Sequence, residues 1–152
     1  MTVTAGDVLL YRPSGLFGRL IALKTWNEIS HVEVSIGGGF AVASRDGKGV
    51  NVYPERTAQL AHVLRPVQPF DLAAAMAWFE EDAKGLPYGW LDIAAFLGLK
   101  WDAKGVICSP FATDFLRAGG LDPFNGYPSR SVAPFMFRTS PVFVDVTESL
   151  GV

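Results

Sequence analysis

The chain is organised around one stretch, ICSPFATDFLRAGG, at residues 107–120. Ser109 is a favourable N-cap and Pro110 suits the first helical position, so the stretch predicts a helix that begins at this point. Gly119 and Gly120 at the other end predict the left-handed stop that commonly ends a helix. Large apolar residues recur at helical spacing and indicate that one face of the helix is buried; they are Phe111, Phe115 and Leu116.

Cys108 lies at the front edge of this predicted helix. Backbone N–H groups point outward there, and their field favours a thiolate over a thiol. A nucleophilic cysteine needs such an environment, which makes Cys108 a candidate nucleophile. The alternative is that Cys108 is a small buried hydrophobe, because free cysteine is among the most buried residue types.

Length and composition describe one folded domain over residues 1–152. Of the 152 residues, 49% are hydrophobic and 18% are charged, which excludes a disordered chain, and the net charge of −2 gives no reason to expect nucleic acid as a partner. A single cysteine excludes an internal disulfide. The N-terminus lacks the pattern of a secretory signal, and the apolar run Val8–Leu10 is too short to span a membrane. We therefore expect no transmembrane segment, and a cytoplasmic location is the default expectation.

Alternating hydrophobic residues predict an antiparallel sheet in the first half of the chain. Residues 29–36 alternate strictly, with His31, Glu33 and Ser35 on the face opposite the valines and isoleucines. The glycines at 37–39 predict a hairpin that leads into a returning strand. The sequence predicts strands at 8–11, 29–36, 40–44, 50–53, 61–65 and 142–146.

Helices are predicted before, within and after this block of strands. Residues 16–23 fit a helix with one apolar face, which indicates packing on the core. Asp71 is a predicted cap for a helix that runs to residue 84, and a further helix after residue 89 carries Trp90, Ile93, Ala94 and Leu97. Residues 121–141 predict a long ordered loop. The fold class that follows is α+β, an antiparallel meander sheet packed against helices.

A cysteine nucleophile needs a base, and the chain contains two histidines. His31 lies on a strand that looks central, beside apolar neighbours that fix its backbone. His62 lies on a short strand bounded by Arg65 and Pro66, which is more typical of an edge. We therefore expect His31 to be the base, although a lone histidine on an alternating strand is also typical of a purely structural residue.

The partner that orients His31 depends on the hairpin. With a two-residue turn at 37–38, His31 faces Ser44, whose hydroxyl can accept the imidazole N–H; with a loop over 37–39 it faces Arg45, which cannot. Glu33 shares the face of His31 but lies about 6.6 Å along the strand, at about 3.3 Å per residue, and would have to bend back. Ser44 is the candidate orienter, with Glu33 or no orienter as the alternatives.

Neither a metal nor a cofactor is expected. The two histidines stand apart and only one thiol exists, so no cluster has the spacing of metal ligands. The glycines at 37–39 join two strands, which is the wrong context for a phosphate-binding loop. Asp7 follows a glycine before a strand, and we interpret it as a turn residue.

Four motifs occur along the chain in a defined order. They are Gly6-Asp7-Val8-Leu9, Ser30-His31-Val32, Pro87-Tyr88-Gly89-Trp90-Leu91-Asp92 and Ile107-Cys108-Ser109. This ordered set resembles the circularly permuted branch of the NlpC-type papain-like superfamily, which includes the YiiX-like permuted amidases and the lecithin:retinol acyltransferase group. In that branch the histidine strand precedes the cysteine helix. The resemblance runs from about Gly6 to Pro141 and implies a permuted papain-like fold.

The resemblance also implies roles for individual residues. Cys108 would be the nucleophile, and His31 would take the thiol proton and later protonate the leaving group. Tyr88 would line the substrate cleft, and the backbone N–H of Cys108 would help to hold the oxyanion. Members of the family often carry an acidic residue, a histidine or a glutamine on the second strand as the orienter, whereas this chain has Ala43 or Ser44 there.

The first functional hypothesis is a cysteine peptidase or amidase that cleaves an amide or ester bond through an acyl-thioenzyme. Peptides of the bacterial cell wall are one substrate class that the resemblance implies. A second hypothesis is an acyltransferase or thioesterase that acts on lipid-linked acyl groups with the same pair of residues. The third hypothesis is a non-enzymatic one: a binding or structural module that keeps the fold but catalyses no reaction.

Overall fold

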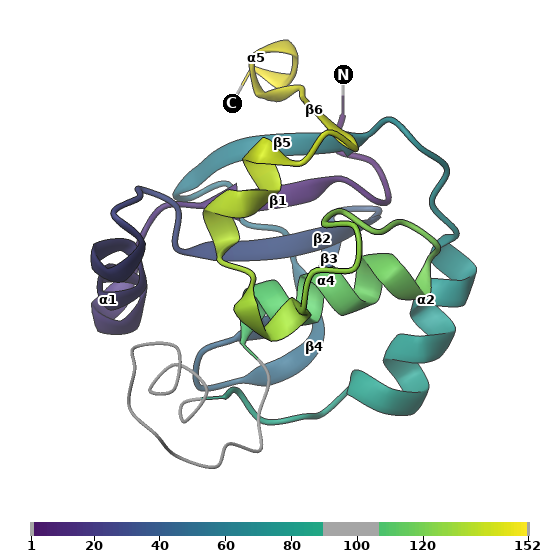
Figure 1. Ribbon diagram of the computed structural model, residues 1–152, viewed down its shortest axis with the longest axis horizontal. Helices are drawn as coiled ribbons and strands as arrows, with labels where there is room; N and C mark the ends of the chain where they lie inside the picture. Colours follow the sequence, from purple (N-terminus) through teal and green to yellow (C-terminus); the bar gives the residue numbers. More distant parts are fainter. Residues whose placement is uncertain (1, 90–106, 152) are drawn as a thin grey trace.

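The computed structural model describes residues 2–89 and 107–151 of the chain (Figure 1). Its centre is a six-stranded antiparallel sheet with the strand order β4-β3-β2-β1-β5-β6. The first four strands lie side by side in chain order, as predicted for a meander, whereas β5 returns to the far side of β1. The strands are β1 (Val8–Tyr11), β2 (His31–Gly37), β3 (Phe40–Arg45), β4 (Gly49–Pro54), β5 (Leu60–Pro66) and β6 (Phe143–Asp145).

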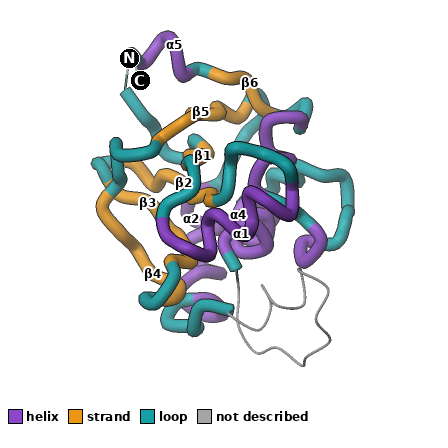
Figure 2. Tube along the Cα trace, turned by 90° about the vertical axis from the view of Figure 1, so that its left-hand side faces the viewer, coloured by secondary structure: helices purple, strands orange, loops and turns teal. Residues whose placement is uncertain are grey.

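Helices cover one face of this sheet, so the fold is a mixed α+β arrangement. Figure 1 shows α4 crossing the sheet with α2 beside it, and Figure 2 shows the strands to one side of these two helices. The helices are α1 (Gly15–Thr25), α2 (Leu72–Trp78), which continues into a π-helical turn (Phe79–Ala83), α4 (Cys108–Ala118) and α5 (Thr147–Leu150), with short 3-10 turns at Ser129–Ser131 and Pro134–Thr139.

Both faces of the sheet are buried. The face toward α4 supplies the main core, in which alternate residues of the strands meet the apolar stripe of α4; among these are Val8, Leu10, Val32, Val34, Val42, Phe111, Phe115 and Leu116. A smaller cluster on the opposite face is Leu9, Tyr11, Ala41 and Val63, packed against Leu60, Val146 and Leu150. Glu33 and Ser35 are also fully buried on this opposite face, so the polar positions of β2 do not face water.

The hairpin between β2 and β3 has a two-residue turn, one residue later than the predicted turn at 37–38. Gly38 and Gly39 form the turn, both with positive φ, and Gly37 pairs with Phe40. A bulge between Ser35 and Gly37 then shifts the register, so that Ser35 pairs with Ala41. Continued along the strands, this register sets Arg45 across from His31.

The start of α4 differs from the prediction by a few residues. The N-cap is Ile107, and Cys108 is the first helical residue. Ser109 does not cap the helix because its hydroxyl donates a hydrogen bond to the carbonyl of Val132, at 2.6 Å. At the other end Gly120 has the predicted left-handed conformation, whereas Gly119 has a φ of −85° and is needed because the ring of Phe70 approaches it closely.

The prediction for the first helix is wrong in its packing. Leu16 and Leu23 of α1 are 69% and 67% exposed, and Figure 1 shows α1 standing apart from the sheet. The core cluster on the helical side of the sheet includes residues of α2 and α4, and it contains neither Leu16 nor Leu23. The apolar residues at the start of the chain therefore do not all belong to the core.

Later predicted segments have mixed outcomes. Asp71 caps α2 as expected, because its side chain accepts a hydrogen bond from the backbone of Ala74, at 3.0 Å. The segment 121–141, predicted as a loop, contains the two short 3-10 turns. The helix predicted after residue 89 lies outside the described residues.

Candidate active site

Cys108 lies at the N-terminus of α4, where that helix meets the start of β2. Its side chain is 1% exposed, and Sγ lies 4.0 Å from the carbonyl oxygen of Ser30, the distance of a weak S–H hydrogen bond. Backbone N–H groups of a first helical turn lack intrahelical acceptors, so the end of the helix favours a negative charge. The thiol is therefore buried at the N-terminal end of a helix.

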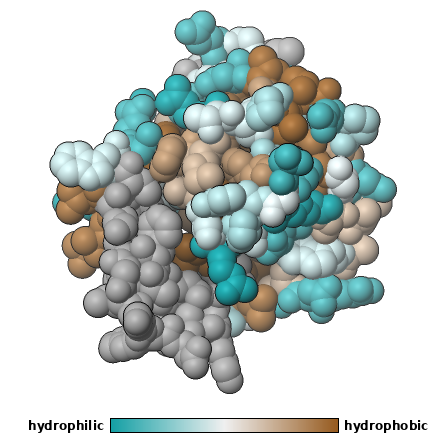
Figure 3. Space-filling model, in the orientation of Figure 1, coloured by the Kyte–Doolittle hydropathy of each residue, from teal (hydrophilic) through white to brown (hydrophobic). Residues whose placement is uncertain are grey.

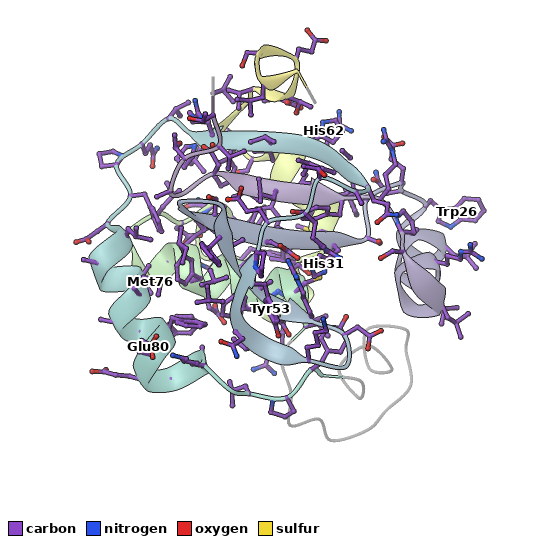
Figure 4. The ribbon with its side chains drawn as sticks, turned by 180° about the vertical axis from the view of Figure 1, so that it is seen from behind. Trp26, His31, Tyr53, His62, Met76 and Glu80 are labelled. Carbon is purple, nitrogen blue, oxygen red and sulfur yellow. The ribbon has the colours of Figure 1, made fainter. Side chains whose placement is uncertain are left out.

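His31 is the first residue of β2, and the structure brings it together with Cys108. The charge and hydrogen-bonding capacity of the Cys108 side chain raise the pKa of the imidazole, which indicates that the two side chains are close, and 17% of the His31 side chain is exposed. The backbone here is held by Tyr11, which pairs with His31 and accepts a hydrogen bond from the N–H of Ser30, at 3.0 Å. Figure 4 shows His31 within the body of the molecule, whereas His62 lies near its edge on β5. The two residues chosen from the sequence are thus neighbours in space.

Glu33 is the side chain that the structure places on the other side of the imidazole. Its Oε1 lies 3.0 Å from Nε2 of His31. Because Nε2 is engaged by Glu33, Nδ1 is the ring nitrogen left to face the thiol. The orienter chosen from the sequence, Ser44, does not lie across from His31, because the bulge in the hairpin produces the other register. Glu33 was expected to lie too far along the strand to reach His31 without bending back. The two side chains nevertheless meet, because both extend from the same face of β2.

Two arginines hold Glu33 in place. Arg45 donates from Nε to Oε1 at 2.8 Å and from Nη2 to Oε2 at 2.9 Å, and Arg56 donates from Nη2 to Oε1 at 3.0 Å. The guanidinium of Arg45 stacks 4.4 Å from the ring centre of Tyr53, and that of Arg56 lies 4.6 Å from the ring of Tyr11. The carboxylate thus has three cationic or potentially cationic partners, which fixes its position beside the imidazole.

This arrangement shifts both ionisation equilibria. Burial alone would raise the pKa of Glu33, but hydrogen bonds and positive charges from His31 and Arg45 outweigh it and lower the pKa to about 2. Burial alone would lower the pKa of His31, but the negative charge and hydrogen bond of Cys108, followed by those of Glu33, raise it to about 9. The imidazolium is therefore the favoured form of His31 at neutral pH when it faces a thiolate.

Tyr88 lies close to the same pair. It is buried, and burial followed by the negative charges of Cys108 and Asp46 raises its pKa above the ordinary value. Its segment is tied to β4 because Val50 and Leu86 share a backbone hydrogen bond of 2.9 Å. Tyr88 is therefore within electrostatic range of Cys108.

Ser30 and Arg56 are two residues of the site that the sequence argument did not single out. Ser30 is 2% exposed, and among the described residues its hydroxyl has no hydrogen-bond partner. It precedes His31, and its own carbonyl faces Cys108, so an unused donor lies next to the pair. Ser30 could have been chosen from the sequence because it directly precedes His31. Arg56 could not, because it lies 23 residues from Glu33 along the chain.

The remaining candidates have structural partners elsewhere. The carboxylate of Asp7 is buried and forms two hydrogen bonds with Arg65, at 2.9 and 2.6 Å. His62 lies 2.8 Å from Asp145, on the edge of the sheet formed by β5 and β6. Within residues 2–89 and 107–151, no group of three or more histidine, cysteine or acidic side chains could hold a metal ion.

A comparison with models of known protein families and one with curated proteins both find no match for this chain. Among the helices that the structure describes, none has the length and apolar character needed to cross a bilayer. Cys108, His31 and Glu33 are therefore the residues from which a function can be inferred.

Proposed function

We propose that this protein is a cysteine hydrolase that cleaves an amide or ester bond, with Cys108 as nucleophile and His31 as base. The observation that carries the proposal is the line Cys108–His31–Glu33, in which the imidazole lies between a buried thiol and a buried carboxylate. Nucleophile, base and orienter in this order are the minimum set for acyl transfer by a thiol. The permuted papain-like fold is part of this proposal, supported by the histidine strand preceding the cysteine helix and by the antiparallel sheet.

Each group has a defined role in the proposed reaction. His31 takes the proton of the Cys108 thiol, and the thiolate attacks the carbonyl carbon to form a C–S bond. The oxygen of the tetrahedral intermediate accepts a hydrogen bond from the backbone N–H of Cys108, at the start of α4. Collapse of the intermediate breaks the C–N or C–O bond, and the imidazolium gives its proton to the leaving amine or alcohol. Water, deprotonated by His31, then hydrolyses the thioester and releases the acid.

Glu33 positions the base. A carboxylate on Nε2 fixes the ring orientation and stabilises the imidazolium that forms in each step. The arginines prevent the carboxylate from turning away, and the depressed pKa of Glu33 keeps it ionised throughout the neutral range. Peptides of the bacterial cell wall and lipid-linked acyl groups are the substrate classes that we would screen first.

The test is the rate of Cys108 alkylation by iodoacetamide between pH 5 and pH 10, followed by intact mass. We expect the wild type to react fast below pH 7 and His31→Ala to move the profile to higher pH. His62→Ala is the matched control, since it removes the other histidine beside a carboxylate and is expected to leave the profile unchanged. Slow reaction with identical profiles in all three proteins would contradict the proposal.

A second measurement separates an enzyme from a binding module. Incubation with activated esters or amides is expected to leave one acyl group on Cys108 of the wild type and none on Cys108→Ala. A non-catalytic module would bind its ligand equally well in both proteins and acquire no adduct.

A further inference from the structure

The helix α1 presents apolar side chains to water. Leu16 and Leu23 lie seven residues apart, which places them on one face of the helix, and they are 69% and 67% exposed. Trp26 follows at the C-cap in a left-handed conformation and is 91% exposed. Figure 3 shows hydrophobic surface at the edge of the molecule where Figure 1 places α1. An apolar stripe on a surface helix normally faces the core, so exposed apolar side chains on α1 indicate a docking surface.

The same helix is basic. Arg19 is exposed and lies three residues after Leu16, on the same side of the helix. The sequence of α1 contains Arg19 and Lys24 and no acidic residue, in a chain whose net charge is −2. The acidic residue that follows, Glu28, lies 3.7 Å from Arg12 in an exposed ion pair. Positive charge and apolar surface are therefore concentrated on one short element.

We propose that α1 docks the protein on the surface of an anionic lipid bilayer. Basic residues beside exposed leucines, with a tryptophan at the end of the helix, match the chemistry of the boundary between phosphate groups and acyl chains. The leucines and Trp26 enter the acyl region, and Arg19 contacts the phosphates. An apolar surface on a protein partner would satisfy the leucines but would not require the basic residues, which is why a bilayer is the favoured occupant.

The position of α1 connects this surface to the candidate active site. The helix joins Tyr11 at the end of β1 to His31 at the start of β2, and these two residues are paired in the sheet. Docking would therefore turn the end of the sheet that carries His31 toward the bilayer. If the proposed hydrolase chemistry is correct, and only then, this favours acyl groups of lipids as substrates over free peptides.

Vesicle flotation tests the docking surface. We expect wild-type protein to float with vesicles of phosphatidylcholine and phosphatidylglycerol, to float less at high salt, and to remain unbound with phosphatidylcholine alone. Leu23→Gln and Trp26→Asn are each expected to weaken binding about tenfold, since each removes a large side chain from the acyl region. Asparagine is chosen at position 26 because it tolerates the left-handed backbone. Val67→Gln is the matched control, because Val67 is 61% exposed but lies just beyond β5.

Two results would overturn the docking proposal. One is equal flotation of the wild type, Leu23→Gln and Trp26→Asn, or no flotation of any of them. The other is a wild-type dimer in sedimentation velocity that Leu23→Gln dissociates, which would assign the surface to a second copy of the chain. Alkylation of Cys108 is measured on the same variants: an unchanged alkylation profile with absent vesicle binding would reject the docking surface alone, whereas normal vesicle binding with an unreactive thiol would reject the hydrolase alone.

Discussion

The two histidines of this chain have similar immediate surroundings and different wider ones. His31 lies 3.0 Å from Glu33 and His62 lies 2.8 Å from Asp145, and the two imidazole side chains are 17% and 16% exposed. Judged by the contact between ring and carboxylate alone, either histidine qualifies as an oriented base.

The difference lies in what surrounds each carboxylate. Glu33 is fully buried and bound by Arg45 and Arg56, whereas 42% of the Asp145 side chain is exposed. His31 also contacts a thiol, and His62 lies on the edge formed by β5 and β6. A carboxylate beside an imidazole is therefore a common surface feature, and the thiol together with the buried counter-charges marks the candidate catalytic pair.

Replacing each carboxylate by its amide gives the largest expected contrast. Glu33→Gln leaves two arginines beside a neutral group in a buried position, and we expect it to lower the free energy of unfolding by about 3–5 kcal/mol. Asp145→Asn disturbs an exposed pair and is expected to cost below about 1 kcal/mol. Urea unfolding at pH 7 measures both. Equal losses of unfolding free energy in the two variants would show that burial of the Glu33 cluster adds no stability beyond that of an exposed pair.

The same pair of variants has a pH signature. The pKa of Glu33 is lowered from 4.5 to about 2, so the stabilisation by its carboxylate is complete above pH 4.5 and is lost as the pH falls toward 2. The stability difference between wild type and Glu33→Gln should therefore shrink across that window.

Removing each arginine is expected to give the next largest contrast. Arg45 makes two hydrogen bonds to Glu33 with only 13% of its side chain exposed, whereas Arg56 makes one and is 34% exposed. Loss of the partner of a buried charge costs most where water cannot replace it, so we expect about 3 kcal/mol for Arg45→Ala and about 1 kcal/mol for Arg56→Ala. Thermal or urea unfolding measures the difference. The reverse order would show that Arg56 is the main counter-ion.

The titration of His31 tests whether the thiol or the carboxylate controls the base. In the wild type its pKa is raised to about 9, and Cys108 contributes more to this than Glu33 does. Cys108→Ala removes the charge and the hydrogen bonding that raise the pKa of His31. Burial, which lowers this pKa, is then opposed only by Glu33, so the imidazole should lose its proton at a lower pH. Histidine resonances followed by NMR between pH 5 and pH 10 report this shift. An unmoved His31 would mean that the thiol does not contact the imidazole.

The sequence predicted those parts of the molecule that depend on local pattern. Alternation located the strands from β1 to β5, and helical spacing located α4. The position of Cys108 at the start of a predicted helix and that of His31 on a central-looking strand led to their choice as a pair, since a strand and the N-terminus of a helix packed on it can bring two such residues together. These predictions depend on the residues within each segment and do not require knowledge of the elements that pack against it.

The sequence did not predict features in which a contact from a distant part of the chain replaces a local one. The hydroxyl of Ser109 could cap a helix, but a carbonyl from residue 132 competes for it and the helix begins earlier. A bulge at the hairpin decided the register and removed Ser44 from its predicted position. Arg56 reaches Glu33 from a segment 23 residues away, and no periodicity records such a contact. The apolar residues of α1 followed helical spacing, but Leu16 and Leu23 are exposed and do not join the core.

The smallest expected effect concerns His62. His62→Gln replaces the imidazole by a neutral amide that keeps a hydrogen-bond donor near Asp145, so the free energy of unfolding should change by less than about 0.5 kcal/mol at pH 7. Raising the salt concentration should reduce even this difference, because the pair is near water. Cys108 alkylation in this variant should match the wild type, since His62 lies on the outer strands rather than beside α4. A loss of reactivity here comparable to that of His31→Ala would remove the distinction on which the choice of base depends.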